Sequence, residues 1–190
     1  STAVHARSKG WDVTVVEKGR IGGKAAGIEQ GGYRLDPGPS IIILKSIYEN
    51  VFRSLGRNLD DYVQFERLDP ITRVFFEGRV YDIPSDREEA CRFVDSLDKS
   101  DGKAFRELLS KLDRVAPFID QSVFARPYEK PWQLADPNLV KFALPFDVRK
   151  SYRELVDGWF KHPLLKAFFY GFPSYGGQGY ESKAAGALLI

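Results

Sequence analysis

The sequence contains few of the residue types that mark metal or redox sites. Of its 190 residues one is cysteine (Cys91), two are histidine (His5 and His162) and none is methionine. A single cysteine excludes an internal disulfide and a cysteine-based zinc site, and the two histidines lie too far apart for a metal-ligand spacing. The sequence therefore predicts no metal site. It also favours a reducing compartment, so we expect a cytoplasmic location.

An excess of one charge sign and long apolar runs are also lacking. The chain carries 28 Lys+Arg and 26 Asp+Glu, a net charge of +2, and the basic residues are interleaved with acids. Such a charge distribution gives no general attraction to phosphate backbones, so nucleic acid is not an expected partner. No apolar run reaches the roughly 18 residues of a conventional membrane-spanning helix. Peripheral contact with a membrane surface stays open.

Both ends of the chain resemble interrupted elements. Residues 1–10 (STAVHARSKG) are typical of the last half of a helix, with Gly10 at the left-handed stop position. Residues 181–190 (ESKAAGALLI) begin a helix that has no end. The absence of methionine at position 1 indicates either that an initiator was removed before Ser1 or that the chain is a fragment. The two interrupted ends together favour a fragment of a longer protein.

The segment after the first helix has the pattern of a strand that ends in an acid. Asp12–Glu17 (DVTVVE) is β-branched, which predicts the second half of a βαβ unit. In dinucleotide-binding units an acid at this place accepts hydrogen bonds from ribose hydroxyls, about 20 residues after a G-x-G-x-x-G turn. Counting back from Glu17 places that turn before Ser1. A lone strand-end Glu is more often structural than functional.

Later segments predict a mixed α and β chain. Alternating residues predict short strands at 63–67, 72–76 and 79–83, the last two joined by a Glu77-Gly78 turn. Capping residues and apolar spacing predict helices at 85–97, 100–118, 137–144, 147–160 and 163–169. The expected fold class is therefore α/β, or α+β overall.

The glycine-rich stretch that follows Glu17 carries a family resemblance. Its matching features are Glu17, Gly22-Gly23-Lys24, Gly32-Tyr33, Asp36 and Gly38-Pro39. In this order they resemble the flavin-binding opening of the FAD-dependent amine oxidase/carotenoid desaturase superfamily, and the chain is most similar to bacterial phytoene desaturases. One departure is Lys24, where the family usually has Arg, so that a point charge replaces a planar fork of donors.

The resemblance implies an FAD site and names its residues. It implies that Glu17 accepts hydrogen bonds from the ribose hydroxyls, that two glycines let the backbone approach the dinucleotide, and that Lys24 faces the pyrophosphate. The Gly38-Pro39 passage is expected beside the isoalloxazine. The full set is Glu17, Lys18, Gly22, Gly23, Lys24, Gly38, Pro39 and Ser40. No catalytic residue and no oligomeric state follow from the sequence.

The resemblance also implies a domain organisation and an activity. Residues 1–45 would form a partial Rossmann-type FAD-binding domain, and residues 46–190 a substrate domain with a small antiparallel sheet and several helices, truncated at its C-terminal end. The expected activity is an FAD-dependent oxidoreductase that transfers hydride from a long apolar, carotenoid-like polyene to flavin. Alternatives are a related flavin-dependent isomerase or saturase, an amine oxidase, and a non-catalytic fragment that binds lipid or protein.

An aromatic and basic segment near the C-terminus bears on the substrate. A polyene dissolved in a bilayer needs an entrance that touches lipid, and residues 139–172 have the composition of such a surface. A core lining or a polyene tunnel explains the same residues. His162, which precedes Pro163, is expected at a helix N-terminus and not in catalysis.

Overall fold

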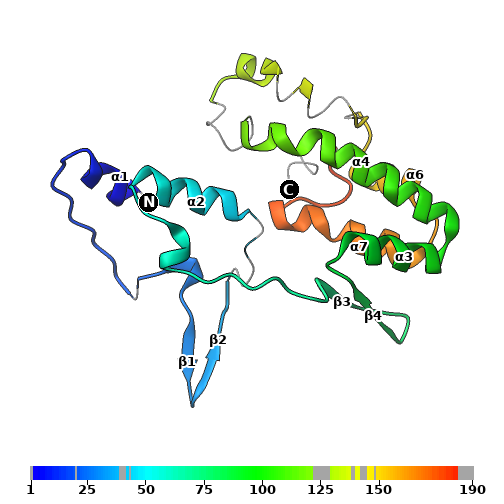
Figure 1. The fold of residues 1–190 in the computed structure, drawn as a ribbon, viewed down its shortest axis with the longest axis horizontal. Helices are drawn as coiled ribbons and strands as arrows, with labels where there is room; N and C mark the ends of the chain where they lie inside the picture. The colour runs from blue at the N-terminus through cyan, green and yellow to red at the C-terminus, as the bar shows by residue number, and fades with distance from the viewer. Residues whose placement is uncertain are drawn as a thin grey trace. The chain divides into compact units, whose positions relative to one another are not determined.

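The chain divides into two compact units. The computed structural model describes residues 2–19, 21–38, 42, 44–121, 129–137, 140–141, 145–147 and 149–183, without the side chains of 118–121, 131, 134 and 176 (Figure 1). Unit 1 comprises Ser1–Phe65 and unit 2 comprises Glu66–Ile190. The structural division therefore lies 20 residues beyond the predicted domain boundary at 45/46.

Unit 1 consists of short elements linked by turns. They are α1 (Thr2–Ser8), the 3-10 helix η1 (Gly23–Ala25), β1 (Ile28–Gln30), β2 (Tyr33–Leu35), α2 (Lys45–Ser54) and the 3-10 helix η2 (Leu59–Asp61). The first helix ends before Gly10, whose φ of 84° confirms the predicted left-handed stop. Strands β1 and β2 form an antiparallel hairpin in which Ile28 lies opposite Leu35.

The predicted strand at residues 12–17 is not present. These residues belong to no ladder in the described part of the chain, and the side chains of Val15 and Val16 are 70% and 91% exposed. A strand is stabilised by hydrogen bonds to a neighbour, and no described residue provides one. The sheets formed by the described residues are two antiparallel hairpins.

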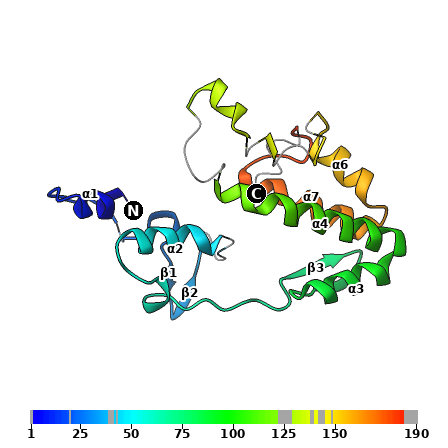
Figure 2. The same cartoon turned by 45° about the horizontal axis from the view of Figure 1, so that its top comes forward.

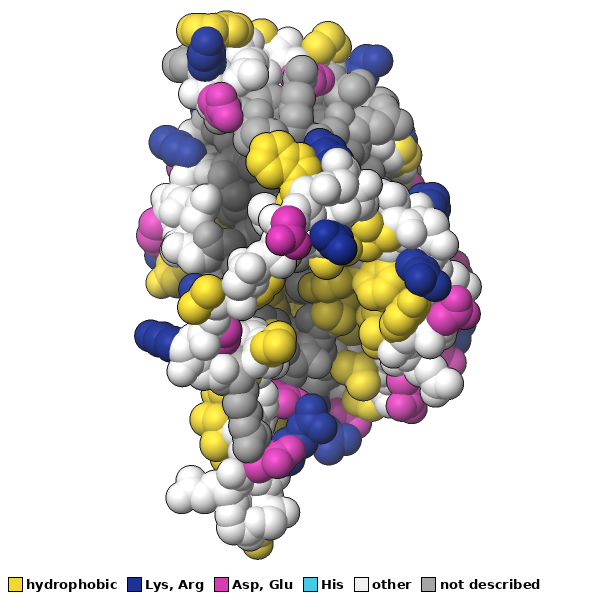
Figure 3. All heavy atoms as spheres, turned by 90° about the vertical axis from the view of Figure 1, so that its left-hand side faces the viewer, with side chains coloured by type: hydrophobic (Ala, Val, Ile, Leu, Met, Phe, Trp, Pro, Cys, Tyr) yellow, Lys and Arg dark blue, Asp and Glu magenta, His cyan; other side chains and the backbone are white. Residues whose placement is uncertain are grey.

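Apolar side chains of unit 1 lie largely at its surface. Among the described residues of this unit only Leu59 is buried, and Trp11, Ile21, Tyr33 and Leu35 are exposed. Figure 3 shows a face of the molecule on which hydrophobic side chains (yellow) stand among charged ones. In the part of unit 1 that the structure describes, the contacts are therefore mainly local turns and hairpin bonds, with little hydrophobic core.

The described residues of unit 2 form one hairpin and a group of helices. Its elements are β3 (Thr72–Phe76), β4 (Arg79–Ile83), α3 (Arg87–Leu97), α4 (Lys99–Gln121), the 3-10 helix η3 (Pro131–Ala135), α6 (Tyr152–Trp159), α7 (Pro163–Tyr170) and the 3-10 helix η4 (Phe172–Gly176). The hairpin β3–β4 has the predicted bounds, and its turn residues Glu77 and Gly78 have φ of 48° and 73°. Positive φ at both turn positions matches the twist of the flanking strands.

The strand predicted at residues 63–67 is wrong. The chain enters the hairpin through Asp69-Pro70, and the first ladder-like bond is donated by Ile71 N to Ile83 O. Pro70 has no N–H to donate, so the ladder begins after it, and residues 63–67 belong to no strand.

Helix starts in unit 2 are set by side-chain caps. Asp86, and not the predicted Ser85, caps α3 by accepting from Glu89 N at 2.9 Å. Helix α6 begins five residues later than predicted, because a capping box formed by Ser151 and Glu154 fixes its start. His162 caps α7 through Nδ1, which accepts from Leu164 N at 3.2 Å, as expected for a helix N-terminal residue.

Four helices of unit 2 enclose a hydrophobic core. Helices α3 and α4 lie side by side (Figure 2), and α6 and α7 pack against each other. The buried cluster comprises Val94, Leu108, Val115, Phe146, Tyr152, Val156, Phe160 and Leu165. The rings of Phe160 and Phe169 stack with centroids 4.8 Å apart. The predicted apolar face of the helix at 100–118 is therefore confirmed at Leu108 and Val115.

The segment at 139–172 contributes to this core. Of its apolar residues Phe146, Phe160, Leu164 and Leu165 are buried, while Phe142 lies outside the described residues. The core interpretation thus applies to these four side chains, since a buried side chain cannot also contact lipid. In the described part of the chain, no helix combines the length and the hydropathy needed to cross a bilayer.

A buried carboxylate joins the two helix pairs. The side chain of Asp101, in the first turn of α4, is 1% exposed. Its oxygens accept hydrogen bonds from Lys161 N at 2.9 Å and from His162 N at 2.7 Å. Because both donors precede α7, Asp101 fixes the start of α4 against the start of α7.

Candidate functional site

Glu17 lies at the end of the extended segment of unit 1. Its Oε1 accepts a hydrogen bond from Gly19 N at 3.0 Å, and its side chain is exposed. A carboxylate has lone pairs beyond the one used in this bond, so it can accept further donors. Lys18, the next residue, is exposed as well. The predicted acid is therefore accessible and oriented by the turn that follows it.

The Gly22-Gly23-Lys24 sequence forms a tight turn that leads into η1. Gly22 has φ of 131° and Gly23 has φ of 54°, which residues with a Cβ rarely adopt. Ala25 N donates to Gly22 O at 2.9 Å and closes the turn. The glycine pair is thus required by the backbone itself, and it leaves the turn without side chains at two consecutive positions.

Gly38 packs directly against this turn. A Cβ at Gly38 would lie 1.8 Å from Lys24 O, so no other residue fits here without a shift of the backbone. The contact brings together Lys24, which follows the glycine pair, and Gly38, which is 14 residues further along the sequence. The structure thus places Gly38 against the backbone of Lys24.

A hairpin that the sequence did not predict connects the two glycine elements. Strands β1 and β2 turn at Gly31 and Gly32, which have φ of 59° and 81°. Two glycines between I-E-Q and Y-R-L are the signal that could have identified this turn. At the base of the hairpin, Arg34 Nε lies 3.9 Å from Asp36 Oδ1. The hairpin closes the loop between Lys24 and Gly38.

Two of the predicted site residues cannot be placed. Pro39 and Ser40 lie outside the described residues. Of the remaining six, the structure brings Gly22, Gly23, Lys24 and Gly38 together, whereas Glu17 and Lys18 lie on the preceding segment. Among the described residues no group of three or more His, Cys, Asp or Glu side chains could hold a metal ion.

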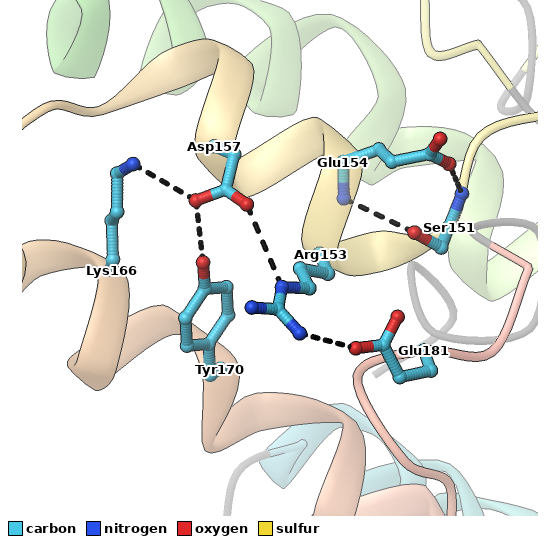
Figure 4. Close-up of polar contacts among 7 residues, drawn as sticks. All are labelled: Ser151, Arg153, Glu154, Asp157, Lys166, Tyr170 and Glu181. Atoms are coloured by element: carbon cyan, nitrogen blue, oxygen red, sulfur yellow. Dashed lines mark hydrogen bonds and ion pairs between the residues drawn. The ribbon is translucent and has the colours of Figure 1, made fainter.

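Unit 2 has a polar cluster centred on Asp157 (Figure 4). Tyr170 donates its hydroxyl to Asp157 Oδ1 at 2.5 Å, and Lys166 Nζ lies 2.9 Å from the same oxygen. Arg153 bridges Asp157, at 3.7 Å, and Glu181, to which its Nη1 donates at 2.6 Å. The hydrogen bond from Tyr170, assisted by Lys166, lowers the pKa of Asp157. Burial and the bond to Asp157 raise the pKa of Tyr170 to about 12.

Contacts of this cluster and of the backbone beside it join residues 180–182 to the first turn of α6. Tyr152 N donates to Ser182 O at 3.0 Å and Arg153 N donates to Tyr180 O at 2.8 Å. These two N–H groups belong to the first turn of α6, where helices lack internal acceptors. The raised pKa keeps Tyr170 protonated as a donor, and the lowered pKa keeps Asp157 charged as an acceptor. The cluster therefore has a structural role, which is to hold residues 180–182 against α6.

Comparisons with known proteins place the chain. Residues 1–140, more than half of its length, match the model of the family described as flavin containing amine oxidoreductase. The chain belongs to this family.

Individual relatives carry the names of carotenoid enzymes. A 4,4'-diapolycopene oxygenase from Methylomonas sp is 30% identical over 193 residues, covering 100% of this chain and 39% of the relative. A carotenoid 3,4-desaturase from Haloarcula japonica is 30% identical over 175 residues, 87% of this chain and 34% of the relative. A 4,4'-diapophytoene desaturase from Staphylococcus aureus is 27% identical over 134 residues, 69% of this chain and 26% of the relative. The chain thus spans less than half the length of these relatives.

The residues of unit 1 fit part of a flavin. An exposed carboxylate at Glu17 can accept from hydroxyl groups, and the side-chain-free turn at Gly22 and Gly23 allows close approach of a bulky ligand. A Cβ built on Gly23 meets no atom within 4 Å, so open space adjoins the turn. These features suit the nucleotide portion of the cofactor that the family implies.

Proposed function

We propose that this chain forms part of an FAD-dependent oxidoreductase that acts on a long apolar polyene of the carotenoid class. The proposal is supported by the names of its relatives, which denote desaturases and oxygenases of diapolycopene, diapophytoene and related carotenoids. The observation that carries it is the contact between Gly38 and the Gly22–Lys24 turn.

In this proposal six described residues hold the cofactor, and Pro39 and Ser40, which lie outside the described residues, complete the proposed set. Glu17 accepts from the ribose hydroxyls, and the backbone of Gly22 and Gly23 approaches the dinucleotide. Lys24 and Lys18 add positive charge near the pyrophosphate. Gly38 lies beside the ring system. When bound, the flavin supplies the redox chemistry by accepting a hydride, while the protein binds, orients and excludes water.

The finer fold assignment belongs to the same proposal. Residues 12–17, with their exposed Val15 and Val16, have the composition of a strand that is buried when neighbouring strands are present. We therefore keep the partial Rossmann-type unit at 1–45 and the substrate domain at 46–190 as parts of the proposed organisation. The substrate domain thus includes the whole of unit 2.

Aromatic side chains of unit 2 offer a surface suited to a polyene. Phe168 and Phe172 are half-buried, with ring centroids 5.2 Å apart, and Tyr175, 6.4 Å from Phe172, is 61% exposed. A conjugated hydrocarbon gains from burial of apolar area against such rings. Replacing Tyr175 with Ser is expected to weaken polyene binding, measured by quenching of tryptophan fluorescence. Equal quenching in the parent and in Tyr175→Ser would contradict this placement.

Oxygenation of the same substrate class is a second candidate. It is favoured by the Methylomonas relative, which covers the whole chain and is named an oxygenase. The two candidates differ in the product that the protein forms from a polyene. Mass spectrometry of that product separates them, because desaturation removes two hydrogens whereas oxygenation adds oxygen.

Flavin retention tests the cofactor assignment without requiring activity. The purified chain is incubated with FAD and desalted, and bound flavin is measured by visible absorbance and by quenching of flavin fluorescence. We expect binding by the parent and roughly ten- to hundredfold weaker binding by Glu17→Gln, which loses charged hydrogen bonds to ribose.

Asp12→Asn is the matched control, since Asp12 is another exposed carboxylate of unit 1 and its pair with Arg7 is fully at the surface. This variant is expected to bind FAD as the parent does. Absence of flavin binding in the parent would overturn the assignment for this chain. Equal weakening in the two variants would assign the effect to net charge and remove Glu17 from the site.

A further inference from the structure

The hairpin β3–β4 has two faces with different surroundings. Its register places Phe76 opposite Arg79, and the alternation of side chains puts Tyr81 on the same face as these two residues. The ring of Tyr81 contacts that of Phe93 in α3, with centroids 6.5 Å apart. Phe76, Arg79 and Tyr81 therefore share the face of the hairpin that is turned toward the helices of unit 2.

A hollow lies between the hairpin turn and the start of α7. It has a volume of about 330 Å³ and is lined by Phe76, Glu77, Arg79, Tyr81, His162 and Pro163. His162 caps α7, and Pro163 is the first residue of this helix. The volume is in the range of sites for small organic molecules, roughly 300–1,000 Å³. None of the lining residues belongs to the set proposed for flavin or to the rings proposed for the polyene.

Arg79 is the arginine of this hollow, and its donors are unused. The other described arginines of unit 2 each have a hydrogen-bond or ion-pair partner, as Arg73 does in its bonds of 2.6 and 2.8 Å to Asp82. In the described part of the chain Arg79 forms no such contact. A guanidinium presents its N–H donors in a planar fork that matches the two oxygens of a carboxylate. Arg79 is thus available to bind a carboxylate from outside the chain.

His162 adds a second donor to the hollow. Its Nδ1 accepts from Leu164 N at 3.2 Å, so the neutral imidazole carries its proton on Nε2. Nε2 has no hydrogen-bond partner among the described residues, and it can donate to an anion in the hollow. The rings of Phe76 and Pro163 provide apolar surface beside these two donors. An inorganic anion would leave that surface in contact with water, whereas the body of an organic anion would cover it.

We propose that this hollow, called the hairpin pocket below, binds a small organic carboxylate with an aromatic or aliphatic body. Arg79 binds the two carboxylate oxygens, and His162 Nε2 donates to one of them. Phe76 and Pro163 contact the body of the ligand. Glu77, the acid of the lining, is exposed, so solvent and salt screen its repulsion of the anion.

Titration of the ¹⁵N-labelled chain with benzoate tests this proposal. Binding is followed by NMR at neutral pH through the amide signals of Gly78, in the hairpin turn, and Leu164, in the first turn of α7. Two comparison probes each lack one feature of benzoate: benzamide has the ring without the charge, and inorganic phosphate has the charge without the ring. We expect saturable shifts at millimolar benzoate, as is usual for so small a ligand. Both comparison probes should bind at least about tenfold more weakly.

Variants assign the binding to the pocket. Arg79→Gln should bind benzoate at least about tenfold more weakly, because it loses charge-assisted hydrogen bonds. Arg73→Gln is the matched control, since it removes the same charge from the opposite face of the same hairpin, and it should bind as the parent does. His162→Asn retains a side-chain acceptor for Leu164 N and loses the Nε2 donor, so it should bind about three- to tenfold more weakly.

A further variant separates ligand contacts from the fold of the turn. Glu77→Gln changes the turn residue next to Gly78 but removes a repulsive charge, so it should bind benzoate at least as tightly as the parent. Far-UV circular dichroism checks that the variants fold. If Arg79→Gln does not fold, Arg79→Lys makes the same comparison, because it keeps the charge and loses the planar fork; it should bind about threefold more weakly.

Several outcomes would overturn the proposal. They are no saturable shift of the parent with benzoate, equal binding of benzamide or of phosphate, and equal weakening by Arg79→Gln and Arg73→Gln. Weakening by Glu77→Gln to the extent seen in Arg79→Gln would assign the effect to the turn and remove the pocket. The titration contains neither FAD nor polyene, so its failure is distinct from failure of the flavin test.

Discussion

The two units of this chain use different means to hold their structure. Unit 2 has a closed core in which Phe160, Leu164 and Val156 are almost fully buried, whereas in unit 1 Leu59 alone is buried among the described residues. Unit 1 relies on glycine turns, a two-stranded hairpin and polar contacts such as Lys45 Nζ to Asp60 Oδ1 at 2.9 Å. Burial of apolar area is the dominant stabilising contribution in folding, so the units should differ greatly in stability.

The two units also differ in their proposed roles, since the well-packed core and the proposed binding residues lie in different units. Residues proposed to hold flavin lie in the unit that has little core, where backbone conformation is set locally by glycines. A ligand that binds only the folded state stabilises it by mass action, so a bound cofactor would contribute to unit 1 what its own side chains do not. Mutations in the two units should therefore have separable effects.

The largest expected effect is on the core of unit 2. Phe160→Ala should lower the free energy of unfolding by about 3–5 kcal/mol, because it removes a buried ring that stacks on Phe169 and leaves a cavity. Urea unfolding followed by far-UV circular dichroism measures this. Val16→Ala in unit 1 is the control and should change the value by less than about 0.5 kcal/mol. Comparable losses in the two variants would contradict the contrast between the units.

A slightly smaller loss is expected when the buried carboxylate is removed. Asp101→Ala leaves the N–H groups of Lys161 and His162 without their acceptor and should cost about 3 kcal/mol in urea unfolding. Asp86→Ala removes an exposed cap from α3 and should cost about 1 kcal/mol. A loss for Asp101→Ala no greater than that for Asp86→Ala would show that burial at this position has little weight.

The pH dependence of stability should reflect the Asp157 cluster. The folded-state pKa of Asp157 is lowered from 3.8 by the hydrogen bond from Tyr170, so its contribution is present above that value and is lost as pH falls through the lower folded pKa. The pKa of Tyr170 is raised from 10.0 to about 12, so its contribution is present below pH 10 and is lost as pH rises toward 12.

Two variants test this assignment in thermal unfolding across pH. Asp157→Asn should reduce the acid dependence of the melting temperature, and Tyr170→Phe should reduce its alkaline dependence. Both effects should occur in unit 2 and leave FAD binding unchanged. An unchanged alkaline profile in Tyr170→Phe would show that another group is responsible.

The smallest effect on unfolding is expected at Gly38. Gly38→Ala places a Cβ against Lys24 O and should disturb unit 1, so that FAD affinity falls while unfolding of unit 2 changes by less than about 0.5 kcal/mol. Gly158→Ala is the reciprocal control, since it lies in α6 with no atom near the added Cβ. It should stabilise unit 2 by about 0.5 kcal/mol and leave FAD binding unchanged. A large loss of unit 2 stability in Gly38→Ala would contradict the independence of the units.

Local signals in the sequence were sufficient for several elements. The hairpin at 72–76 and 79–83, the stop at Gly10 and the helix that follows His162 are confirmed, because turn glycines, alternation and caps act within a few residues. The strands expected at 12–17 and 63–67 are wrong for this structure. Both have strand-like composition, but a strand exists only with a ladder partner, which composition does not provide.

For the candidate site too, some features could be predicted from local sequence and others could not. Sequence alone determined the family resemblance, the order of Glu17, the glycine pair and Gly38, and the absence of a cysteine-based metal site, because these depend only on residue type and spacing. Tertiary structure decided that Gly38 meets Lys24, that the aromatic segment around Phe160 lies in the core, and that Asp101 joins α4 to α7. These contacts link residues that are distant in sequence, and they depend on how the chain folds back on itself in three dimensions.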